Sequence, residues 1–103
     1  MTEVEIVSGI CGFRTVVRSE AQKDYHANLQ VESDCQNVKQ MAENIKQVNV
    51  MTELFKKGES QVLSASRQYL PHVTCPVAVG ILKALEVSAG LALPKDVTIT
   101  FRR

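Results

Sequence analysis

The spacing of hydrophobic residues changes near residue 33, and this change constrains the fold more than any other feature of the sequence. Before it, three stretches alternate apolar and polar residues: residues 3–7, 13–19 and 26–33. In the third stretch Ala27, Leu29 and Val31 share one face, and polar residues occupy the other. This pattern is typical of an antiparallel sheet with one solvated side. The sequence therefore predicts a three-stranded meander, with turns at residues 9–12 and 20–24.

After residue 33 the apolar residues recur at helical spacing. One helix face is predicted from Val38, Met41, Ala42, Ile45 and Val48. Ser33 and Gln36 resemble a capping box, which would place Cys35 in the first helical turn. Residues 49–70 are expected to hold a short helix that ends at Gly58, followed by another that reaches Tyr69.

A final helix is predicted from Pro76 to about Gly90. Its apolar stripe consists of Ala78, Ile81, Leu82, Leu85 and Ala89. Proline suits the first helical position, which makes Cys75 the expected N-cap. Residues 88–94, SAGLALP, fit the core better than an interface, although a dimer contact is the alternative. Residues 97–101 alternate again and predict a last strand.

These patterns predict one α+β domain over residues 1–103. A three-stranded antiparallel meander is expected to be followed by helices and a C-terminal strand. The helices should pack on one face of the sheet, because only one face of the strands is apolar.

Composition and charge exclude several classes of function. The net charge is +1 and the basic residues are scattered, so no nucleic-acid surface is expected. No apolar run is long enough to span a membrane, and the first residues do not resemble a signal peptide. An odd number of cysteines, 3, argues against a closed disulfide framework. We therefore expect a soluble, cytoplasmic protein with reduced thiols.

The cysteines are the candidate functional residues. Cys11 lies in a glycine-flanked turn, whereas Cys35 and Cys75 lie at predicted helix starts, where the thiolate form is favoured. Thiolates bind zinc and iron, and His72, three residues before Cys75, could complete a site or relay a proton. A cysteine taken alone is more often a small buried filler than a functional residue, and His72 could equally cap or donate a hydrogen bond. The sequence shows no C-x-x-C pair, so the ligands would have to converge through folding.

The order of these residues resembles a known family. "ICGF" at residues 10–13, "SDC" at 33–35 and "HVTCP" at 72–76 are similar to the three ligand segments of the IscU/NifU-type iron-sulfur cluster scaffolds, as a divergent member. That resemblance implies three antiparallel strands followed by helices, and a cluster assembly site formed by Cys11, Cys35 and Cys75. It also implies an iron-sulfur cluster or zinc as the bound group, and a cysteine desulfurase or iron-sulfur acceptor proteins as partners.

The sequence departs from that family at three places. Phe13 replaces the acidic residue after the first CG, and Asp34 replaces the glycine before the second cysteine. His72 lies three residues before Cys75 rather than adjacent to it. Asp34 is then the acidic residue that could act as a ligand or base, so the expected metal ligands are Cys11, Cys35, Cys75, His72 and Asp34.

Two other classes of function remain open from the sequence. A thiol-redox protein would use Cys75 at its helix start as the nucleophile, with Cys11 or Cys35 resolving the product. A non-catalytic interaction module would use the cysteines only for packing, and a homodimer is one form it could take. The sequence contains no Ser-His-Asp order and no phosphate-binding loop, which favours a protein that is not an enzyme.

Overall fold

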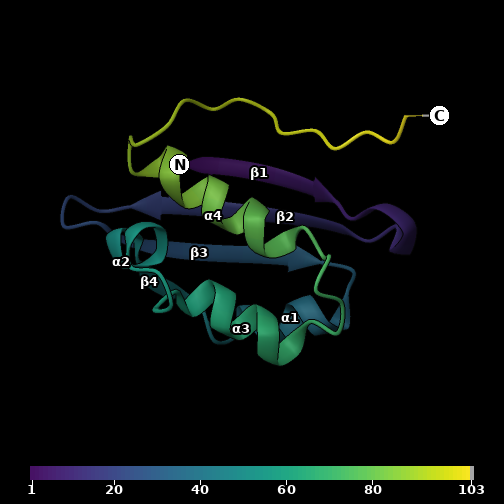
Figure 1. Cartoon of the computed structure of the whole chain (residues 1–103). Coiled ribbons are helices and arrows are strands. Elements are labelled where there is room, and N and C mark those ends of the chain that lie inside the picture. Colours follow the sequence, from purple (N-terminus) through teal and green to yellow (C-terminus); the bar gives the residue numbers. More distant parts are fainter. Residues whose placement is uncertain (103) are drawn as a thin grey trace.

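The structure, a computed structural model, describes residues 1–102 and has an α+β architecture. The strands are β1 (Thr2–Val7), β2 (Arg14–Ala21), β3 (His26–Ser33) and β4 (Gln47–Asn49). A single 3-10 turn, η1 (Gly9–Cys11), lies between β1 and β2. The helices are α1 (Gln36–Ala42), α2 (Val50–Phe55), α3 (Gln61–Tyr69) and α4 (Val77–Ser88). Figure 1 shows all of these elements in chain order.

The four strands form one antiparallel sheet in the order β1-β2-β3-β4. Val17 of β2 faces Val4 of β1 and Val31 of β3, so the apolar positions of the three strands lie on the same face. The opposite face is charged: the Arg18 guanidinium binds the carboxylates of Glu3 and Glu32 at 2.7 and 2.9 Å. The predicted meander with one solvated side is therefore confirmed.

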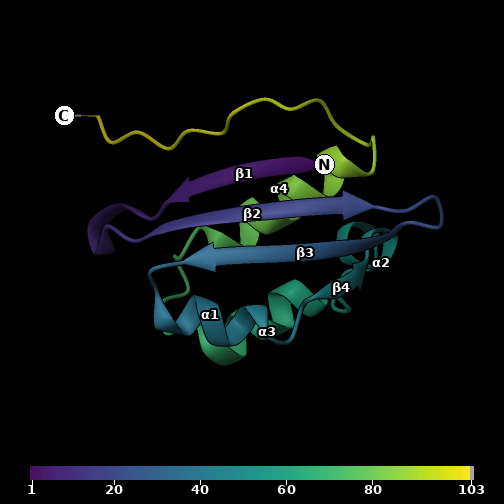
Figure 2. The same ribbon diagram turned by 180° about the vertical axis from the view of Figure 1, so that it is seen from behind.

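The helices cover the apolar face of the sheet. Helix α4 packs on β1 and β2, while α1 packs on β3 and on α3. In Figure 1 α4 lies in front of the strands, and in Figure 2, which views the molecule from behind, it lies behind them. Fully buried side chains from both layers, including Val17, Met41, Ile81 and Leu85, form the core. Among residues 1–102 no helix has the length and apolar character needed to cross a membrane.

The first helix is shorter than the sequence predicts. It ends at Ala42, although Ile45 and Val48 continue the helical spacing and are both buried. Val48 instead lies opposite Ala27 in the short strand β4, which the sequence analysis did not predict. The helical spacing of Ile45 and Val48 therefore reflects burial and not a longer helix, because the edge strand β4 buries Val48 as a helix would. The two helices expected within residues 49–70 are confirmed as α2 and α3.

The predicted C-terminal strand is wrong for the described chain. Residues 91–102 have no regular secondary structure, and Val97, Ile99 and Phe101 are exposed. The core prediction for SAGLALP fails at Leu93, whose side chain is 87% exposed. Alternation alone does not form a strand, because its backbone groups need a hydrogen-bonded neighbour.

Two predicted helix caps also differ from the structure. Cys35 is itself the N-cap of α1, and Ser33 is hydrogen-bonded to Thr15 and to the Cys35 N–H instead of forming a capping box. Pro76 is the N-cap of α4, so Cys75 lies one residue outside the cap position. Both cysteines nevertheless lie where a segment enters a helix.

Candidate functional site

Three segments of the chain meet at one end of the sheet and enclose a cavity of about 220 Å³. They are the β1–β2 loop, the junction between β3 and α1, and the loop between α3 and α4 (Figure 1). Cys11, Cys35, Cys75 and His72 all line this cavity. The tertiary structure therefore brings the three cysteines and the histidine of the sequence analysis to one place, and we call it the thiol cavity.

Cys11 is positioned by a tight loop between β1 and β2. The loop is closed by hydrogen bonds from Ser8 N to Phe13 O, at 3.1 Å, and from Gly12 N to Gly9 O, at 2.9 Å. Gly9 and Gly12 both have positive φ, 81° and 71°, a conformation that side chains with a Cβ disfavour. The two glycines therefore allow the chain to reverse and leave the Cys11 side chain exposed at the mouth of the cavity.

Cys35 is held by a chain of hydrogen bonds that starts inside the sheet. The hydroxyl groups of Thr15 and Ser33 are 2.8 Å apart, and Ser33 Oγ accepts a hydrogen bond from Cys35 N at 3.1 Å. Thr15 is fully buried and Cys35 is half-buried. Because Thr15 and Ser33 lie opposite each other in β2 and β3, the sheet itself fixes the backbone of Cys35.

Cys75 and His72 belong to the loop that leads into α4. Cys75 N donates to the carbonyl oxygen of His72 at 3.2 Å, which closes a turn between the two residues. His72 is exposed and Cys75 is half-buried. The turn explains how a histidine three residues away from the cysteine can line the same cavity.

Asp34, the fifth residue of the predicted ligand set, does not line the thiol cavity. It is exposed, and its N–H donates to the Arg14 carbonyl at 3.4 Å. The residue follows the end of β3, where the parity of the strand directs neighbouring residues to opposite faces. The structure thus separates Asp34 from the cysteines that it was expected to assist.

The rest of the cavity wall is mainly apolar and uncharged. Ile10, Phe13, Val38, Leu70 and Pro71 contribute to it. Within the described residues, no Lys, Arg, Asp or Glu lines the cavity, so His72 and the thiols are its ionisable groups.

The thiols share a cavity but do not form a finished metal site. No group of three His, Cys, Asp or Glu side chains within residues 1–102 is placed to hold a metal ion. All three cysteines are free thiols. Every buried side-chain nitrogen and oxygen in this range already has a hydrogen-bond partner, so no orphaned polar atom marks a ligand. The chemistry of the donor set, three thiols and one imidazole, is what fits a soft metal or a cluster.

Thr15 and Ser33 belong to this site, but the sequence did not indicate them. Both lie at positions of the adjacent strands β2 and β3 that face the core, where the alternating pattern predicts an apolar side chain. A polar residue at such a position is a usable signal, because a buried hydroxyl needs a partner. The partner here, a hydroxyl on the adjacent strand, became visible only once the strand register was known.

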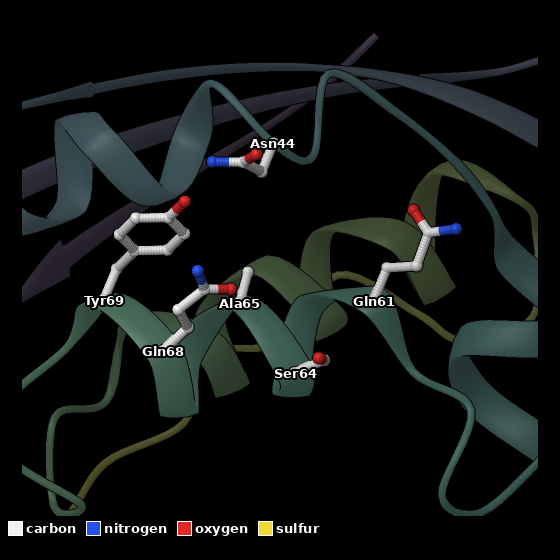
Figure 3. A pocket seen from close by; sticks show the side chains of 6 residues that line it. All are labelled: Asn44, Gln61, Ser64, Ala65, Gln68 and Tyr69. Carbon is white, nitrogen blue, oxygen red and sulfur yellow. The ribbon is translucent and has the colours of Figure 1, made fainter.

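A second hollow, of about 210 Å³, lies between α3 and the segment after α1 (Figure 3). It is lined by Asn44, Gln61, Ser64, Ala65, Gln68 and Tyr69. In Figure 3 the Tyr69 hydroxyl points toward the Asn44 side chain across this hollow. Amides and hydroxyls can donate and accept hydrogen bonds, but they are poor ligands for soft metals. The thiol cavity is therefore the better candidate for chemistry.

Comparison with known families gives a match over almost the whole chain. A family model described as "Family of unknown function (DUF6951)" matches residues 2–101. The chain belongs to this family. Neither the curated proteins nor the solved structures yield a match. The family assignment covers every residue of the thiol cavity, and function has to be argued from the cavity itself.

Proposed function

We propose that this protein binds an iron-sulfur cluster or a soft metal ion in the thiol cavity, as a carrier or assembly scaffold of the kind that its sequence resembles. The observation that carries the proposal is the convergence of Cys11, Cys35 and Cys75 on one cavity, although 24 and 40 residues separate them along the chain. Convergence of all the cysteines in a chain is not needed for packing, since each could fill the core separately.

The three thiols come from differently held parts of the chain. The backbone of Cys35 is anchored through Ser33 to the buried Thr15, whereas Cys11 ends the 3-10 turn between β1 and β2 and Cys75 lies in the loop before α4. Because no group of three such side chains within residues 1–102 is already placed to hold a metal ion, binding would have to draw the thiols together, with His72 as the fourth donor. A bound cluster would supply iron-sulfur chemistry, and the protein's residues would supply thiolates and an apolar wall that limits water.

The proposal favours a transferable group over a structural zinc ion. A structural zinc site is closed and normally required for folding. Here the core consists of buried apolar side chains from both layers, and the thiols lie at its periphery. A group bound at the end of the sheet, beside the exposed side chains of Cys11 and His72, could be loaded and released without unfolding the protein.

The redox alternative has less support from the geometry. It depended on Cys75 at the N-cap of the last helix, and Pro76 occupies that position. Cys75 therefore lies one residue outside the cap, beyond the first turn where the field of a helix N-terminus is strongest. The proposed carrier needs free thiols, which a reducing cytoplasm would maintain. Its proposed partners remain a cysteine desulfurase and iron-sulfur acceptor proteins.

The test is anaerobic reconstitution of the purified protein with ferrous iron and sulfide and, separately, with zinc. We expect visible sulfur-to-iron charge-transfer bands and a stoichiometric metal content, and each of Cys11→Ser, Cys35→Ser and Cys75→Ser should lower the retained metal. Metal uptake should also increase with pH, because the thiols must lose protons to bind.

His72 and His26 provide a matched pair of variants. His26 lies at the start of β3 and does not line the thiol cavity, so His26→Ala should bind like the wild type. His72→Ala should bind more weakly or release its metal faster. If the triple cysteine-to-serine variant takes up as much iron and zinc as the wild type, or if the wild type takes up neither, the proposed function is wrong.

A further inference from the structure

Residues 95–102, which we call the C-terminal arm, carry a strand pattern that the described chain does not use. Val97, Ile99 and Phe101 alternate with polar residues, and they are 60%, 84% and 92% exposed. Exposing three large alternating side chains costs free energy, since apolar area in water is unfavourable. An arm of this composition has the properties of a strand without a neighbour.

The sheet has an open edge of matching length. β1 pairs with β2 along one side, and within residues 1–102 no strand pairs with its other side. An edge strand presents unpaired N–H and C=O groups that can accept another strand. In Figures 1 and 2 the arm runs in the same direction as β1 and beyond this edge, yet it makes no regular backbone pairing.

The two faces of the arm match the two faces of β1. On β1, Val4 and Ile6 point to the helical layer, and Glu3 and Glu5 point to the charged open face. A strand laid on this edge with Val97, Ile99 and Phe101 on the helical side leaves its polar residues, Asp96 and Arg102 among them, on the face of the two glutamates. The arm thus matches the edge in its apolar and polar faces rather than in charge.

We propose that the arm adds as a strand to the β1 edge of a second copy, so that two chains exchange arms. Each chain carries both the arm and an open β1 edge, so two copies can pair with each other. When each copy gives its arm to the other, the dimer has two-fold symmetry and the β1 edge of each copy is covered. Within a single chain the arm runs past the β1 edge without forming a strand, so the edge remains open to the arm of another copy.

The test measures self-association by analytical ultracentrifugation over a wide range of protein concentration. The wild type should form a dimer, and Ile99→Asp should raise its dissociation constant at least about tenfold, because each dimer buries two copies of this side chain. Ile99 is exposed in the single chain, so this substitution should leave the fold of the monomer intact. A chain that ends at Pro94 should be monomeric.

Thr98→Asn is the control. Thr98 lies on the other face of the arm, which stays solvated in the exchanged pair, so this polar, uncharged substitution should weaken the dimer much less than Ile99→Asp does. A mixed sample of isotope-labelled and unlabelled chains should show nuclear Overhauser contacts between the arm of one copy and β1 of the other. A wild type that is monomeric at every concentration, equal association of the Ile99→Asp variant, or arm contacts only to β1 of the same copy would overturn the proposal.

Discussion

At the scale of single residues, the least expected feature is a buried carboxylate that caps a helix from outside it. Glu53 of α2 is only 6% exposed. Its carboxylate accepts hydrogen bonds from Ser60 Oγ at 2.7 Å, Gln61 N at 2.8 Å and Val62 N at 2.9 Å. These are the first groups of α3, whose N–H donors have no partners within the helix. The negative charge is therefore compensated by backbone donors and by the positive end of the helix.

Replacing Glu53 by Gln should destabilise the protein by about 2 kcal/mol, because an amide NH₂ would face backbone N–H donors and bonds to a charged acceptor would be lost. The free energy of unfolding in urea measures this effect. Glu59→Gln is the control, since Glu59 is exposed on the loop before α3, and it should change stability by less than about 0.5 kcal/mol. Equal effects of the two substitutions would contradict the capping role.

At the scale of elements, the close contact between α4 and β1 fixes how the helical layer lies on the sheet. Gly80 of α4 lies directly over Ile6 of β1, and a Cβ atom added at Gly80 would be 2.5 Å from Ile6 Cγ1. No real contact is that short, so the helix approaches the strand as closely as a glycine permits. Glycine is therefore needed at this position because there is no room for a side chain, and not because of the backbone conformation, since the φ of Gly80 is not positive.

Gly80→Ala should destabilise the protein by about 1 kcal/mol, as the overpacking cost exceeds the gain in helix propensity. In an Ile6→Ala background the same substitution should become neutral or stabilising, because the crowding atoms are gone. Thermal or urea unfolding of the four proteins in this double-mutant cycle measures the coupling. A Gly80→Ala effect of the same size in both backgrounds would show that the contact does not limit the packing.

Elements also differ in how well the sequence predicts them. The sequence predicts β3 at its observed bounds because successive residues alternate between the core and solvent, and this alternation depends only on neighbouring residues in the chain. The end of α1 could not be predicted, because Ile45 and Val48 are buried by the turn and by pairing with β3 rather than by a helix face. The arm fails for the opposite reason: Val97, Ile99 and Phe101 have the right pattern but no strand beside them.

At the scale of the whole molecule, the thiol cavity lies at the periphery of the hydrophobic core. Met41, Ile45, Ile81 and Leu85 are among the largest fully buried side chains and do not line the cavity, whereas Val38 and Leu70 belong both to the core and to the cavity wall. Most of the core, which supplies most of the stability, is therefore packed away from the cavity, and we expect it to fold without a bound metal.

Removal of metal by a chelator under reducing conditions should leave a folded protein with well-dispersed amide NMR signals and a cooperative thermal transition. Added zinc or reconstituted cluster should raise the thermal midpoint in proportion to the logarithm of its concentration above saturation, because it binds the native state only. Loss of dispersed signals on chelation would instead identify a structural metal site and would contradict the transferable group proposed above.

The sequence by itself determined the meander, its solvated face and the presence of helices after it, because periodicity is a property of neighbouring residues. It also identified the three cysteines and His72 as the residues to follow. Only the tertiary structure decided that these four side chains share one cavity, that Asp34 lies outside it, and that Thr15 anchors Cys35. Each of these outcomes depends on groups far apart in the chain, whose distances are set by strand register and by the packing of α4.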